Sequence, residues 1–137
     1  MRRTIILSAL LLSCGSQAGE LELALHGVGL AGKKLYIAVH DSAQDFPMDD
    51  SKALTREVTA TGELTALSIG GLPAGEYAVA VFADLNGNGA LDSNFIGIPK
   101  EPVGMSRDAQ GRFGPPKFSD AVFRVGDGVT RQTIHLK

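Results

Sequence analysis

Apolar residues recur at every second position along much of this chain. In ELELALHG the alternate residues Leu21, Leu23 and Leu25 fall on one face of an extended segment, and KKLYIAVHD repeats the pattern. Successive side chains of a β-strand point to opposite faces, so a period of two indicates strands with one buried face. EYAVAVFAD carries apolar residues on both faces, which predicts a strand that is covered on both sides.

The same pattern accounts for most of the chain. REVTATGELTALSI indicates two strands around Thr61-Gly62, and DAVFRV and VTRQTIHL supply two short runs near the C-terminus. Glycine and proline turn signals separate the runs, and no window predicts a convincing amphipathic helix. The sequence therefore predicts an all-β fold, an antiparallel seven-stranded sandwich with one long irregular loop.

That loop runs from about residue 84 to residue 119. It is rich in Gly and Pro and lacks hydrophobic periodicity, although the other predicted connections are short. Long ordered loops in compact domains are usually functional. We therefore expect any functional site to lie in this connection.

The N-terminus is typical of a secretory signal peptide. Arg2 and Arg3 precede an apolar run that is too short to anchor the chain in a bilayer, and small residues follow. Ser16-Gln17-Ala18 fits cleavage before Gly19, which divides the chain into a signal peptide, 1–18, and one β-sandwich domain, 19–137. The alternative is a lipobox ending at Cys14, which would make an anchored lipoprotein. Soluble export to the periplasm or the extracellular space is the favoured interpretation.

Composition excludes several classes of protein. Cys14 is the only cysteine, so the domain has neither an internal disulfide nor a thiolate metal site. Without Arg2 and Arg3, 11 basic residues face 15 acidic ones, a formal charge of −4. This balance gives no basic footprint for nucleic acid, and no second segment is long enough to cross a membrane.

Three segments carry a family resemblance: DLNGNGALD, the segment from Gly97 to Gly104, and GRFGPPKF. With the surrounding residues, from about Leu21 to Leu136, they resemble the family called Domain of unknown function 2141. The resemblance implies a small secreted bacterial β-sandwich of Ig-like or prealbumin-like type. It implies no catalytic residues, because the family has no assigned activity.

DLNGNGALD has the spacing of a calcium loop. An EF-hand-type loop uses side-chain oxygens at positions 1, 3 and 5, glycine at 6, a carbonyl at 7 and often a water-mediated ligand at 9. Counting from Asp84, the ligand positions are filled by Asp84, Asn86, Asn88, Ala90 and Asp92. Position 12 should be a bidentate glutamate but is Phe95, so another acid would have to complete the site. The candidates are Glu101, Asp120, Asp41, Asp45, Asp49 and Asp50.

A plain turn explains the same residues. Asn-Gly pairs build turns because both residues tolerate positive φ and asparagine bonds its own backbone. Calcium and the turn remain equal alternatives. With few carboxylates, a calcium site would be weak, on the order of 10⁻⁴–10⁻³ M.

Histidines and acids supply the other candidate chemistry. His26, His40 and His135 lie near predicted strand ends, and their parity points all three away from the core. A zinc site would need them on neighbouring strands with a further ligand, so solvated histidines are favoured. No nucleophile motif is present. An envelope hydrolase using acidic residues near the long loop is the alternative function.

The long connection also predicts a binding surface. Lys100, Arg112 and Lys117 lie close in sequence to Phe95, Phe113 and Phe118, and four prolines stiffen the segment. Aromatic and basic side chains on a stiff loop are typical of interaction sites. Phe113 and Phe118 are expected to pack inward, which leaves the basic residues for a partner. We expect a binding or structural module for a glycan, a peptide or another envelope component.

Overall fold

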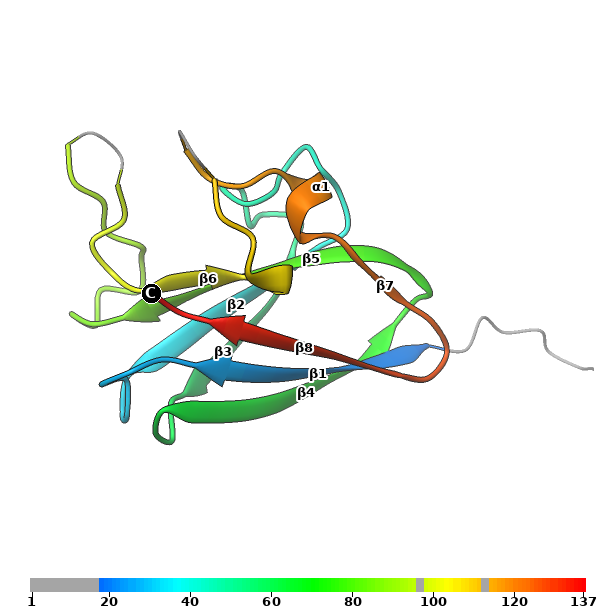
Figure 1. Ribbon diagram of the computed structural model, residues 1–137, viewed down its shortest axis with the longest axis horizontal. Coiled ribbons are helices and arrows are strands. Elements are labelled where there is room, and N and C mark those ends of the chain that lie inside the picture. The colour runs from blue at the N-terminus through cyan, green and yellow to red at the C-terminus, as the bar shows by residue number, and fades with distance from the viewer. Residues whose placement is uncertain (1–17, 96–97, 112–113) are drawn as a thin grey trace, which may run out of the picture.

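The computed structural model describes residues 18–95, 98–111 and 114–137, which form two β-sheets (Figure 1). Almost all of the predicted signal peptide, including Cys14, lies outside these residues. Within them, no helix is long and apolar enough to span a membrane. The strands are β1 (Gly19–His26), β2 (Lys34–His40), β3 (Leu54–Thr59), β4 (Leu64–Leu72), β5 (Gly75–Asp84), β6 (Val103–Met105), β7 (Phe123–Val125) and β8 (Val129–His135).

The strands are arranged in a three-stranded and a five-stranded sheet. The first has the order β4-β1-β8, and the second has the order β3-β2-β5-β6 with β7 also paired to β5. The all-β prediction is confirmed, but two of its details are wrong. The described residues contain eight strands instead of seven, and β1 pairs with β8 in parallel. Alternation along one strand carries no information about the direction of its neighbour, so the parallel pair was not visible in the sequence.

The alternating residues form the core between the sheets, as predicted. Leu21, Leu23 and Leu25 of β1 are buried against residues of β2 and β5 such as Ile37 and Val79. Burial of this apolar surface is the main favourable contribution to folding.

A second, smaller core covers the outer face of β5. Phe46, Ala78 and Ala121 are buried there, and the partly buried side chains of Met105 and Phe118 pack against them. β5 is therefore covered on both sides, and Phe118 packs inward, as its sequence indicates. Phe113 lies outside the described residues.

The prediction that His40 points away from the core, and is therefore solvated, is wrong because its side chain is buried. His40 opposes Val39 along β2, but its own face lies under the second core, and its side chain contacts Phe46 edge-on at 5.3 Å between ring centroids. Its exposed fraction is 1%. Strand parity does not predict the burial of His40, because both faces of this sheet are covered.

The long connection is more regular than predicted. It contains β6, the 3-10 turn η1 (Ser106–Asp108) and the start of the short helix α1 (Phe118–Ala121). Val103 of β6 exchanges backbone hydrogen bonds of 3.1 and 3.0 Å with Lys137, which ties the five-stranded sheet to the segment after β8. A three-residue strand is too short to display alternation, so β6 could not be recognised from the sequence.

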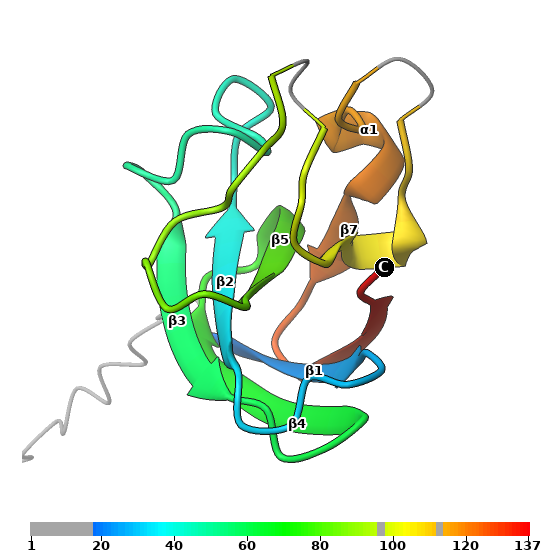
Figure 2. The ribbon, with the colours of Figure 1, turned by 90° about the vertical axis from the view of Figure 1, so that its left-hand side faces the viewer.

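The longer loops lie on one side of the molecule. Figures 1 and 2 show the segment after β2, part of the connection after β5, and α1 on the outer side of the five-stranded sheet, away from β1, β4 and β8. Much of the long connection therefore lies away from the three-stranded sheet (Figure 2).

Candidate functional site

The loop DLNGNGALD begins where β5 ends. Asp84 is the last residue of β5 and pairs with Lys34, the first residue of β2. Its exposed fraction is only 3%. A carboxylate at such a position must find hydrogen-bond donors or a cation, because burying an uncompensated charge is costly.

Backbone N–H groups of the loop supply the donors. Gly87 and Gly89 donate to the two Asp84 carboxylate oxygens at 2.9 and 2.8 Å. Both glycines have positive φ, 76° and 74°, a conformation that glycine adopts without strain. The Gly89 N–H is the largest influence that holds the pKa of Asp84 below its usual value, while burial acts in the opposite direction. The loop therefore curls around an ionised carboxylate.

The two asparagines form successive side-chain turns. The N–H of Asn88 donates to the Asn86 side-chain oxygen at 3.2 Å, and the N–H of Ala90 donates to that of Asn88 at 3.1 Å. Their amide groups donate in turn to Asp92: Asn86 to one carboxylate oxygen and Asn88 to the other, the latter at 2.8 Å. The sequence-predicted residues are thus brought together, in a hydrogen-bonded turn.

Glu101 closes this turn from outside. An isolated bridge between Ser93 and Pro99 folds the chain back, and the Glu101 carboxylate then accepts the N–H of Leu85 at 2.6 Å and of Asp92 at 2.9 Å. Glu101 is 6% exposed. Of the acids considered for completing the site, it is the one that the described contacts bring to the loop.

The other candidate acids have different positions. Asp120 accepts the backbone N–H of Lys117 at 3.1 Å, at the start of α1. The acids between Asp41 and Asp50 follow the opposite end of β2, since Lys34 pairs with Asp84 whereas His40 pairs with Ala78. At about 3.3 Å per residue, those ends are roughly 20 Å apart. Among the described residues, no group of three His, Cys, Asp or Glu side chains is arranged as a metal centre.

The predicted contact residues are only partly described. Lys100 and Lys117 are exposed, the first near β6 and the second immediately before α1, and Arg112 lies outside the described residues. Phe95, which occupies position 12 of the calcium pattern, is 99% exposed. This arm of the connection therefore presents an aromatic ring to solvent a few residues from a lysine.

A second polar cluster was missed by the sequence analysis. His26 and His135 are paired residues on β1 and β8, and Asp108 bonds His135. The sequence signal was limited to two histidines near predicted strand ends. Only the tertiary pairing of the first and last strands shows that they are neighbours.

Comparison with curated proteins and with solved structures gives no match for this chain. The family model described as an uncharacterized protein conserved in bacteria, DUF2141, matches residues 26–133. This range includes the loop DLNGNGALD, Glu101 and most of both sheets. The chain belongs to this DUF2141 family of bacterial proteins.

Proposed function

We propose that this protein is an exported binding module in which a calcium ion, held by the loop from Asp84 to Asp92 and by Glu101, fixes the long connection. The partner would be an envelope component, a glycan or a peptide, that contacts the connection through Lys100, Lys117 and Phe95. The proposed calcium ion would be structural, and the connection would carry the recognition.

The supporting observation is a pair of buried carboxylates, Asp84 and Glu101, that meet at one turn. Asp84 and Glu101 are 3% and 6% exposed, and within the described part of the chain neither forms an ion pair. Each accepts two backbone N–H groups instead. Asp92 adds a third carboxylate to the same turn. Buried charges in proteins are usually paired or coordinate a metal, so this excess of negative charge favours a cation.

The donor set fits calcium. Calcium takes six to eight oxygens with flexible angles, and the loop offers carboxylates of Asp84, Asp92 and Glu101, amide oxygens of Asn86 and Asn88, and the carbonyl of Ala90. A carboxylate has about four lone-pair sites, so Asp84 and Glu101 retain acceptor capacity beyond their N–H partners. The two asparagine amides would turn to offer oxygen in place of N–H. The weak affinity expected for such a set suits a compartment with millimolar calcium.

The surface hollows do not favour the hydrolase alternative. One hollow, of about 460 Å³, lies over the three-stranded sheet and is bordered by Glu22, Ala66 and Arg131. Another, of about 240 Å³, is bordered by Asp41 and Lys52. Neither of these two hollows is lined by Asp84, Asp92 or Glu101, so neither supports a hydrolase site at the acids of the long connection.

Amide chemical shifts test the calcium site directly. In a ¹⁵N-labelled sample titrated with CaCl₂ to several millimolar, we expect saturable chemical-shift changes of the Gly87 and Gly89 amides. Both amides donate to the Asp84 carboxylate, which would coordinate the calcium ion. Asp92→Asn should weaken the response, and the matched variant Asp127→Asn, in the exposed turn before β8, should leave it unchanged. Shifts confined to other loops, or none at all, would contradict the assignment.

A further inference from the structure

Two histidines meet at the ends of the first and last strands. His26 is the last residue of β1 and His135 the last of β8, and they are direct partners in the parallel ladder. Their rings are stacked, with 5.0 Å between centroids and an interplanar angle of 21°. His26 is half-buried and the His135 side chain is 49% exposed, so both rings are accessible to a small solute.

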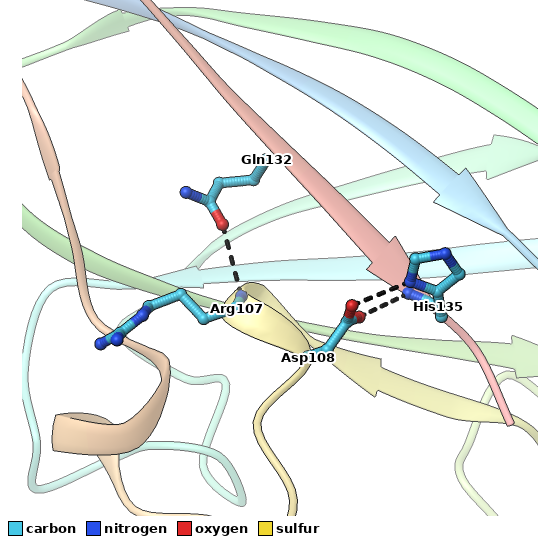
Figure 3. A network of polar contacts seen from close by, with 4 residues as sticks. All are labelled: Arg107, Asp108, Gln132 and His135. Carbon is cyan, nitrogen blue, oxygen red and sulfur yellow. Dashed lines mark hydrogen bonds and ion pairs between the residues drawn. The ribbon is translucent and has the colours of Figure 1, made fainter.

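Asp108 holds the second ring through two contacts, which Figure 3 shows. One carboxylate oxygen accepts the backbone N–H of His135 at 2.9 Å, and the other lies 2.9 Å from its ring Nδ1. In the tautomer that donates its Nδ1 proton to this carboxylate oxygen, the Nε2 lone pair of His135 is available to a ligand.

The backbone is bent to place this carboxylate. Arg107 and Asp108 have φ values of 59° and 49°, the left-handed region that non-glycine residues rarely adopt. The N–H of Arg107 donates to the Gln132 side-chain oxygen at 3.3 Å, which ties the bend to β8 (Figure 3). Backbone conformations of this kind persist only where the surroundings fix them, and they are frequent at functional sites.

We propose that His26 and His135 together bind a divalent transition-metal ion, with Asp108 as the residue that positions His135. A histidine that ligates a metal commonly donates its other ring N–H to a carboxylate, and this is the contact that His135 makes. Imidazole suits copper, nickel and zinc, and copper(II) binds most tightly in that series. These two nitrogen ligands are chemically distinct from the oxygen ligands around Asp84.

The geometry defines an open site with two protein ligands. No three His, Cys, Asp or Glu side chains are grouped around a metal position in the described ranges, so water would complete the coordination. The stacked rings must swing so that one nitrogen of each faces the same point. His26 has this freedom, because its ring forms no hydrogen bond within the described part of the chain, whereas Asp108 fixes His135.

Copper(II) titration followed by electron paramagnetic resonance tests the proposal. The protein is used in a Cys14→Ser background, which removes the one thiol that could compete for copper. We expect one bound ion with two nitrogen ligands. His26→Asn and His135→Asn should each remove one nitrogen and weaken binding strongly. Thr133→Ala, an exposed residue of β8, is the matched control and should bind as the parent does.

Asp108→Asn separates positioning from ligation. The spectrum should keep two nitrogens while affinity falls, by roughly 10–100-fold as for other residues that orient a metal-bound histidine. An affinity unchanged by this variant would overturn the positioning role.

Copper binding that survives both histidine variants would overturn the site itself, and so would the absence of detectable binding in a molar excess of copper(II). Zinc-induced changes in the ¹⁵N chemical shifts of the His26 and His135 ring nitrogens, measured with both histidines and Asp108 in place, give an independent check. Their absence would also overturn the site.

Discussion

At the scale of single residues, the ionised side chain of Asp84 organises the loop that follows β5. Its carboxylate accepts the N–H groups of Gly87 and Gly89, which both have a positive φ that glycine adopts without strain. The sequence identified Asp84 and its neighbours as one unit, because spacing along nine residues is a local property. It could not show how Glu101 meets the same unit, because that contact depends on the bridge between Ser93 and Pro99.

The charge of Asp84 should make stability depend on pH in a defined direction. Its pKa is lowered in the folded protein, so its contribution is present above the unfolded pKa, near 4, and is lost as the pH falls through the folded pKa. Asp84→Asn should therefore lower the free energy of unfolding at pH 7, and the difference from the parent should shrink below about pH 4. Urea unfolding in EDTA between pH 7 and pH 2.5 measures this. A difference that stays constant with pH would contradict it.

His40 should be replaceable by an apolar residue. It is buried, and neither ring nitrogen has an aligned hydrogen bond to any residue that the structure describes, although Nε2 lies 3.2 Å from an Asp50 carboxylate oxygen. This contact stabilises the ring little, because a poorly directed contact with a half-exposed carboxylate compensates burial only weakly. His40→Leu should leave the free energy of unfolding at pH 7 unchanged or raise it by about 1 kcal/mol. A loss above about 2 kcal/mol by urea unfolding would show that the Asp50 contact matters.

At the scale of elements, alternation predicted β1, β2 and β5 well because each is long and has a buried face. It failed for β6, which has three residues, and it could not give the direction of β8. The histidine pair shows the same limit for sites. His26 and His135 are 109 positions apart in the sequence, so only the register of β1 with β8 makes them neighbours.

The contact between β6 and β8 should be sensitive to the volume of residue 104. A Cβ added at Gly104 would lie 2.7 Å from the Ile134 side chain and 2.8 Å from the His135 carbonyl oxygen. Gly104→Ala should therefore lower the free energy of unfolding by about 1–3 kcal/mol, as overpacking does. Gly62→Ala is the matched control, since no atom of the described residues lies within 4 Å of a Cβ there. Equal urea-unfolding midpoints for the two variants would contradict this account of the contact.

At the scale of the whole molecule, the two sheets form a scaffold that presents its long connections on one side (Figure 2). β6 and α1 anchor the connection after β5 at several points, and the turn from Asp84 to Asp92 is its first fixed segment. An ion bound there would stabilise the folded protein as a whole, because the unfolded chain does not assemble the same ligands.

Thermal unfolding of the protein in EDTA, and then in calcium from micromolar to several millimolar, tests whether the loop from Asp84 to Asp92 binds calcium. We expect a midpoint that rises with calcium concentration, by the equivalent of about 2.7 kcal/mol at a hundred times the dissociation constant. Asp92→Asn should weaken this response, and Asp127→Asn should retain it. A midpoint that is indifferent to both calcium and magnesium would contradict the account and leave DLNGNGALD as a turn held by its own hydrogen bonds.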